Sequence, residues 1–236
     1  MLIELHPSAV LRPTIDAYWS RPALGFSAQR ILPDGCADLV FDLARGEAFV
    51  VGTMTAPLDL DLENAPAMFG VRFRAGRAAV VLRERLDALT DRRVSFDAAR
   101  PLAQRLSECS NDAARITLLE RELRDVTIDR RLDGAIALLN CGGRNVDDVA
   151  RVVGISRQHL ARLFREHVGI SPKLFARIAR FRRLLGIARR NGAAPEWASL
   201  AAELGYTDQS HLIADFREFA GTSPVPFFLS MDDSAR

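Results

Sequence analysis

Several features that mark particular protein classes are scarce or missing in this chain of 236 residues. Its three cysteines are an odd number with wide spacing, which excludes a disulfide framework and a CxxC metal knuckle. No run of about 18 apolar residues occurs, so no membrane-spanning helix is expected. The N-terminus also lacks the basic and apolar regions of a secretory signal. These absences predict a cytoplasmic protein with three small, buried, free thiols.

Signatures of catalysis and metal binding are missing as well. The sequence contains no GxSxG, HExxH, P-loop or GxGxxG pattern. The four histidines form no metal-like pair, since His159 and His167 lie eight residues apart and His167 falls on a predicted core face. The turn before residue 37 places Cys36 between the carboxylates of Asp34 and Asp38. Carboxylates raise the pKa of a thiol, whereas a nucleophilic cysteine needs a lowered pKa. We therefore expect no enzyme activity, no cofactor and no metal.

Lysine is nearly absent, since Lys173 is the single one and every other cation is arginine. Residues 1–128 carry 16 arginines against 18 acidic residues, a balance of −2. Residues 129–236 carry 15 arginines and one lysine against 12 acidic residues, a balance of +4. Arginine is the side chain best suited to bidentate contacts with phosphates and bases. The asymmetry indicates a polyanionic partner on the C-terminal side.

The first 75 residues have the pattern of a β-rich domain. Short runs with β-branched or aromatic residues recur about every ten residues, separated by turn signals containing Pro, Gly and Asn. The runs are FSAQRIL, ADLVFDL, EAFVVGT and AMFGVRFR. This spacing predicts a small antiparallel barrel or sandwich, and from Arg77 onward the pattern becomes helical. The expected fold class is α+β, with residues 1–128 forming an N-terminal domain.

The last predicted helix of the N-terminal domain carries a narrow apolar seam. Its residues alternate at spacings of three and four, as in paired helices. One interpretation is a helix packed on its own domain, and the other is a contact between two copies of the chain, which gives a homodimer. The seam residues are Ile116, Leu119, Leu123 and Val126.

The C-terminal half contains an internal repeat. The segment VARVVGISRQHLARLFREHVGISP (149–172) aligns with LAAELGYTDQSHLIADFREFAGTSP (200–224). The offset is 51 residues before the turn and 52 after it, so the second turn is one residue longer. Each copy predicts a helix, a glycine-containing turn and a second helix capped by a hydroxyl residue, Ser156 or Thr207. Two matched copies predict two helix-turn-helix units in an all-α domain over residues 129–236. The units are expected at about 146–168 and 197–220.

The second helix of each unit has one apolar face and one outward face. In the first copy the outward residues are a Gln, an Ala and two Arg, types that bind base edges in the major groove. The second copy offers fewer hydrogen-bonding groups and is expected to read bases less sharply. Asp215 replaces the buried Leu163 of the first copy, so we expect Asp215 at the edge, paired with an arginine of the connecting segment. The residues predicted to bind DNA are Arg157, Gln158, Ala161, Arg162, Arg165, Gln209, Ser210, His211, Ala214 and Arg217.

The segment 171–190 between the two units predicts one long helix. Ser171 is a capping residue and Pro172 suits the first helical position. A helix of this length spans about 28 Å, and the major groove returns on the same face of DNA after roughly 34 Å. A rigid helix therefore holds the two outward faces near consecutive turns of the major groove, which points to duplex DNA. Its apolar face comprises Leu174, Ile178, Phe181 and Leu185.

The pattern GISRQHLARLFREHVGISP, a linker helix, then GYTDQSHLIADFREFAGTSP resembles the DNA-binding domain of the AraC/XylS family of bacterial transcription regulators. The resemblance covers about residues 130–230. The N-terminal half more faintly resembles the β-rich domain of some relatives, through ILPDGCADLVFDL and FGVRFRAGRAAVVL. The resemblance implies a sensor or oligomerisation domain before a domain that binds a promoter or operator, as activator or repressor. It also implies RNA polymerase and a small effector as partners.

By resemblance to the AraC/XylS pattern, the base-facing residues of the first unit are Gln158, Ala161 and Arg162. Those of the second unit fall on Ser210, His211 and Ala214. Relatives commonly carry Arg where Ala214 stands, and this departure agrees with weaker base reading by the second helix. Two alternatives remain: an enzyme that docks on DNA, such as a methyl-acceptor repair protein, whose zinc-bound cysteine cluster is missing here, and an architectural protein without base preference.

Overall fold

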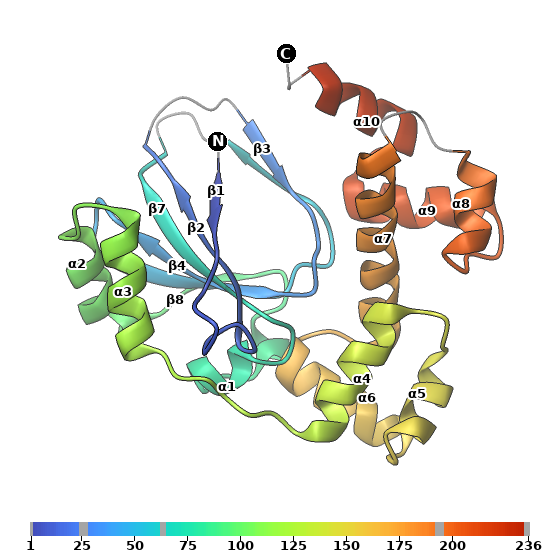
Figure 1. The fold of residues 1–236 in the computed structure, drawn as a ribbon, viewed down its shortest axis with the longest axis horizontal. Helices are drawn as coiled ribbons and strands as arrows, with labels where there is room; N and C mark the ends of the chain where they lie inside the picture. The colour runs from blue at the N-terminus through green and yellow to red at the C-terminus, as the bar shows by residue number, and fades with distance from the viewer. Residues whose placement is uncertain (1, 24–27, 62–64, 192–195, 234–236) are drawn as a thin grey trace.

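The computed structural model describes residues 2–23, 28–61, 65–191 and 196–233. The N-terminal part is built on a six-stranded antiparallel sheet with the strand order β1-β2-β7-β4-β5-β8, and β3 and β6 form a separate antiparallel pair (Figure 1). The sheet-rich N-terminal fold is thus confirmed. The strands are β1 (Ile3–Leu5), β2 (Ile15–Arg21), β3 (Ala28–Ile31), β4 (Ala37–Asp42), β5 (Glu47–Val51), β6 (Leu58–Asp61), β7 (Met68–Phe73) and β8 (Arg93–Ser95).

Short helices cover one face of the six-stranded sheet. These are α1 (Ala78–Leu82), α2 (Arg100–Ser107) and α3 (Asp112–Glu122), together with a 3₁₀ turn, η1 (Leu86–Ala88), and a second one, η2 (Asp97–Ala99). The aromatic side chains that fill this face have no exposed surface, and burial of such large side chains stabilises the sheet. They are Tyr18, Phe41, Phe69 and Phe73.

The apolar seam packs in this core within its own chain, and a homodimer through it stays a prediction. Leu119 is fully buried within its own chain, and Ile116 and Leu123 pack against the same cluster. The helix also ends earlier than predicted, at Glu122, because the backbone of Leu123 is extended. Val126 therefore lies outside the helix, where its N–H donates to Thr14 Oγ1 at 3.1 Å. The interpretation of packing on its own domain is confirmed.

In the C-terminal part, the described residues form helices joined by short turns, and α7 runs through the centre (Figure 1). A continuous core joins the helices, with Phe164, Phe175 and Phe181 buried along α7 and its neighbours. No helix in the described part of the chain is both long and apolar enough to cross a bilayer. The helices are α4 (Arg130–Cys141), α5 (Val146–Val152), α6 (Arg157–Val168), α7 (Pro172–Asn191), α8 (Trp197–Glu203), α9 (Gln209–Ala220) and α10 (Pro224–Asp233).

The three cysteines are free thiols in different environments. Cys36 is buried, and that burial raises its pKa. Cys109 is half-buried and Cys141 is exposed, so the prediction of three buried thiols is right for Cys36 and wrong for Cys141. Among the described residues, no group of three or more His, Cys, Asp or Glu side chains is arranged to hold a metal ion.

Candidate nucleic-acid interface

The first helix-turn-helix unit consists of α5 and α6. Four residues, 153–156, connect the helices, and Gly154 takes the positive φ of 72° that the turn requires. The Ser156 side chain caps α6 by accepting a hydrogen bond from the backbone N–H of His159 at 3.2 Å, as predicted. Leu160 and Phe164 have no exposed surface, so they fix which face of α6 points inward.

The outward face of α6 is accessible over its whole length. Gln158, Arg162 and Arg165 are exposed, and Ala161 is half-buried between them. Arg157 is exposed and lies 3.4 Å from Asp147, an ion pair in solvent that contributes little to stability. Within the described residues, no hydrogen bond or ion pair engages the guanidinium of Arg162 or of Arg165. These groups are therefore available for contacts outside the chain.

The second unit consists of α8 and α9, joined by five residues, 204–208, so its turn is one residue longer, as the change of offset predicts. The predicted cap, Thr207, is wrong. Asp208 accepts the hydrogen bond from the backbone N–H of His211 at 2.8 Å and caps α9. The extra residue shifts the capping position by one, and Asp is as good a cap as Ser.

The predicted contact residues of α9 differ in accessibility. Gln209, Ser210, Ala214 and Arg217 are exposed. His211 is half-buried, and its ring is engaged inside the unit: Nδ1 lies 3.3 Å from Thr207 Oγ1 and Nε2 lies 4.0 Å from Asp215 Oδ1. This ring orientation favours a role for His211 in holding the turn rather than in contacting a base.

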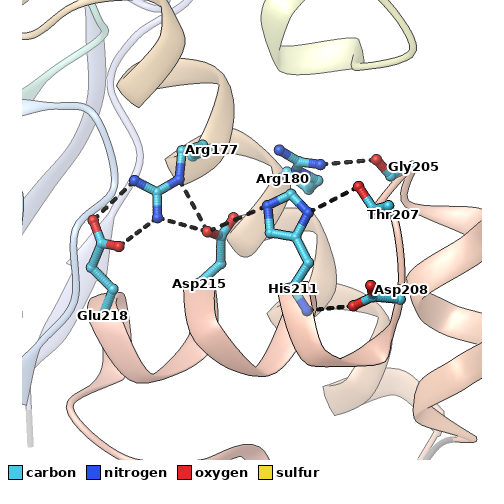
Figure 2. A network of polar contacts seen from close by, with 8 residues as sticks. All are labelled: Arg177, Arg180, Gly205, Thr207, Asp208, His211, Asp215 and Glu218. Carbon is cyan, nitrogen blue, oxygen red and sulfur yellow. Dashed lines mark hydrogen bonds and ion pairs between the residues drawn. The ribbon is translucent and has the colours of Figure 1, made fainter.

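An ion network around the buried Asp215 attaches α9 to the linker helix (Figure 2). Arg177 of α7 donates to Asp215 Oδ1 from Nε at 3.0 Å and from Nη2 at 2.7 Å, and it also pairs with Glu218. These hydrogen bonds, to Glu218 first and then to Asp215, raise the pKa of Arg177. The prediction that Asp215 pairs with a linker arginine is confirmed, but its predicted place at the edge is wrong. Asp215 is 1% exposed because Arg177 reaches in to compensate its charge.

A second linker arginine holds the turn of this unit. Arg180 Nη1 donates to the carbonyl of Gly205 at 2.9 Å (Figure 2). The Arg180 guanidinium also lies 4.3 Å from the centroid of the Tyr206 ring. Burial raises the pKa of Tyr206. Three residues further along α7, Arg183 Nη1 donates to the carbonyl of Cys141 at 2.7 Å. Arginines of the linker helix thus hold the second unit and the end of α4, although their pattern in the sequence is equally compatible with exposure to solvent.

The N-terminal domain contacts both units, which the sequence does not predict. Thr53 Oγ1 donates to the carbonyl of Val168 at 2.6 Å, and Thr90 Oγ1 donates to the carbonyl of Gly169 at 2.7 Å. Arg30 Nη1 donates to the carbonyl of Ala220 at 3.1 Å. The two residues of each contact lie far apart in the sequence, so no local sequence pattern predicts these contacts.

A family model described as a helix-turn-helix domain matches residues 149–228. The C-terminal domain is a helix-turn-helix domain of the AraC type. A second model, described as a domain of unknown function (DUF6597), matches residues 3–95 and covers the sheet of this AraC-type regulator. No curated protein matches the chain. The DNA-binding function that the resemblance implied is thereby assigned to the C-terminal part of the AraC-type regulator.

Solved structures of ToxT from Vibrio cholerae match the AraC-type regulator over nearly the whole of both chains. One at 1.65 Å resolution has a TM-score of 0.46 and 9% sequence identity, covering 97% of each chain. Another, bound to (E)-4-(8-methylnaphthalen-1-yl)but-3-enoic acid, has a TM-score of 0.44 and 9% identity, covering 97% of each chain. A third, bound to an unsaturated fatty acid, has a TM-score of 0.40 and 11% identity, covering 96% of this chain and 92% of that one. The assignment itself rests on the helix-turn-helix model and on the repeat.

Proposed function

We propose that this regulator reads two successive segments of the major groove, with α6 as the main base-reading helix and α9 as the weaker one. The observation that carries the proposal is on α6, where the guanidinium groups of Arg162 and Arg165 are exposed beside Gln158. Neither group has a hydrogen-bond or ion-pair partner among the described residues. Arg binds guanine and Gln binds adenine in bidentate geometry. The outward face of α9 offers Ser210, in the first turn of the helix, and Arg217 as exposed hydrogen-bonding groups.

The other predicted DNA-binding residues have supporting roles in this proposal. Ala161 and Ala214 are small enough to let the helix backbone approach the bases, and Ala favours contact with a thymine methyl group. Arg157 and Gln209, which begin the two helices, lie where side chains bind the DNA backbone. His211 acts indirectly by holding the turn of the second unit.

Selection from a pool of random 30-base-pair duplexes, followed by footprinting of the best binder, tests this function. The expected footprint comprises two protected segments about one helical turn apart on one face of the duplex. The selected duplex should bind at least about 4 kcal/mol more tightly than random DNA. Equal affinity for selected and random duplexes would instead support an architectural protein.

A small effector is a second part of the proposal, favoured by a polar cavity of about 190 Å³ between the two domains. Asp16, Arg74 and Arg77 line it from the N-terminal domain, and Asp133 and Arg182 line it from the helical domain. Mixed charges suit a small polar ligand with both donors and acceptors. Thermal unfolding of the full chain in a panel of polar metabolites tests it, since a ligand raises the melting temperature by mass action. A hit that stabilises the Arg182→Gln variant equally would contradict this location.

The chain acts, in this proposal, by binding alone and in the cytoplasm, where a bacterial promoter lies. A methyl-acceptor enzyme would gain a stable methyl group on incubation with alkylated DNA, which intact mass measurement detects. Contact with RNA polymerase stays a prediction from the family resemblance. A homodimer through the seam is not part of the proposal, because Leu119 is buried in its own domain.

A further inference from the structure

We propose that the β3–β6 pair of the N-terminal domain positions the second reading helix, with Arg30 as the positioning residue. This inference rests on the proposed reading of DNA by two helices. Arg30 lies in β3, on the side of the N-terminal domain that faces α7 and α9 (Figure 1). Its contact with the carbonyl of Ala220 joins segments 190 residues apart in the chain.

Two of the carbonyls that accept from the N-terminal domain, those of Val168 and Ala220, occupy equivalent positions in the repeat. Val168 ends α6 and Ala220 ends α9, 52 residues later, each followed by a glycine with positive φ. Carbonyls in the last turn of a helix have no partner within the helix. Thr53 supplies the donor for the first carbonyl and Arg30 supplies it for the second. The N-terminal domain therefore holds both reading helices by the same end.

The attachment of the first unit is rigid. Thr53 is 1% exposed, so its hydrogen bond to Val168 is shielded from water. Gly169 packs so closely that a Cβ there would lie 3.0 Å from the carbonyl oxygen of Leu86. Arg85 of the same region pairs with Glu166 of α6 at 3.0 Å. Several contacts thus fix α6 on the N-terminal domain.

The attachment of the second unit is narrow and adjustable. The Arg30 side chain is 40% exposed, and a Cβ at Gly221 would meet only the ends of Arg30 and Pro57, at ordinary contact distances of 3.4 Å. The β3–β6 pair forms its own small sheet apart from the six-stranded one. This charge-assisted hydrogen bond adds a restraint from the N-terminal domain to the end of α9, which the Arg177 network already attaches to α7.

Arg30 is oriented for this contact by its strand partner. Asp59 lies directly across the pair and accepts from Arg30 Nε at 2.6 Å and from Nη2 at 2.8 Å. These hydrogen bonds raise the pKa of Arg30 and lower that of Asp59. The bidentate geometry leaves Nη1 pointing to Ala220, so the guanidinium is in place before α9 docks.

The contact leaves the reading face of α9 open. Ser210 and Ala214 lie toward the N-terminal end of the helix and are exposed, whereas Arg30 bonds to its C-terminal end. A bond at that end restrains the orientation of α9 without covering the DNA-facing residues. The restraint lowers the entropy lost when both helices bind one duplex, so it strengthens two-segment binding.

The test compares Arg30→Met with Arg45→Met in the full chain. Arg45 is exposed in the N-terminal domain, and within the described residues no hydrogen bond or ion pair engages its guanidinium, so its loss removes the same charge without touching α9. The probes are the best duplex from random selection and the same duplex with its second segment scrambled. We expect Arg30→Met to weaken binding to the intact duplex about 5- to 10-fold and to leave the scrambled duplex unchanged. Arg45→Met should behave as wild type on both.

Hydrogen exchange without DNA supplies a second measurement. In Arg30→Met, backbone amides near Ala220 should exchange faster, while those near Val168 keep their wild-type rates. Three outcomes for Arg30→Met would overturn the inference. They are an equal loss of affinity on both duplexes, unchanged affinity together with unchanged exchange, and tighter binding than wild type. A wild-type chain that selects no sequence refutes the proposed function and this inference with it, whereas sequence selection without any Arg30 effect refutes the inference alone.

Discussion

At the scale of single side chains, the equivalent position in the two units holds different chemistry. Leu163 packs in the core of the first unit, and Asp215 is buried at the matching place in the second. Burying a carboxylate is costly unless a charged partner compensates it. Arg177 is that partner, so the second unit depends on one arginine of the linker helix in a way that the first unit does not.

Removing that arginine tests the dependence. Arg177→Met should destabilise the chain by about 3–5 kcal/mol, since it leaves a buried charge without compensation. Combining it with Asp215→Leu, which restores the residue type of the first copy, should recover most of the loss. Urea denaturation measures both, with Arg165→Met as the exposed control. A double variant as unstable as Arg177→Met would show that Asp215 is not the source of the cost.

The proposed division between the reading helices is a second test at this scale. Arg162→Ala should cost about 1–3 kcal/mol of binding free energy and relax the preference at one base pair. Ser210→Ala should cost less, because a lone hydroxyl makes one neutral hydrogen bond, typically worth about 0.5–1.5 kcal/mol. Both variants are titrated against the same selected duplex. A loss at Ser210 that equals or exceeds the loss at Arg162 would reverse the ranking.

At the scale of secondary-structure elements, α3 acts as a core helix of the sheet domain. Its buried residue Leu119 contacts the apolar cluster beneath the sheet. Leu119→Ala should therefore destabilise the chain by about 2–5 kcal/mol through the lost contacts and the cavity left behind. Thr117→Ala, on the exposed side of the same helix, is the matched control. Thermal unfolding and sedimentation are measured together, and a change of oligomeric state without loss of stability would support the dimer interpretation.

Elements with strong local signals were predictable from the sequence. The helices of the two units carry caps, positive-φ glycines and apolar faces within a few residues, and the repeat supplies each signal twice. Strands such as β1 and β8 were missed because three residues are too few for an alternating pattern. They are specified by pairing with distant strands, and tertiary context decides such short segments.

The candidate interface was predictable to a similar extent. Exposure of the outward residues of α6 follows from helical periodicity alone, because Leu160 and Phe164 fix the inward face. The inward turn of the His211 ring does not follow from periodicity, since it depends on Thr207 and Asp215. The contacts of Thr53 and Arg30 link residues more than 100 positions apart, which no local pattern encodes.

At the scale of the whole molecule, Gly169 joins a helix end to the neighbouring domain. It combines a φ of 89° with close packing against Leu86, whereas Gly154 has a φ of 72° and open space, with no atom within 4 Å, where a Cβ would lie. Gly154→Ala should cost about 1–2 kcal/mol for the left-handed backbone alone. Gly169→Ala should cost about 1–3 kcal/mol more, because the methyl group also forces the domains apart. Equal costs in denaturant titrations of the full chain would show that the domain contact adapts freely.

The internal use of the linker arginines has a consequence for how binding responds to salt. Arg177, Arg180 and Arg183 donate to groups within the chain, so they do not neutralise phosphates. Each phosphate neutralised releases counterions and contributes about −0.9 to the slope of log K against log salt concentration. We expect a slope of about −4 to −5 for the selected duplex, far shallower than the 15 arginines and one lysine of residues 129–236 suggest. Binding titrations across a range of NaCl concentrations measure the slope. A slope steeper than about −8 would mean that the linker arginines exchange their partners within the chain for phosphates when DNA binds. The cations counted are all exposed: Arg157, Arg162, Arg165, Lys173 and Arg217.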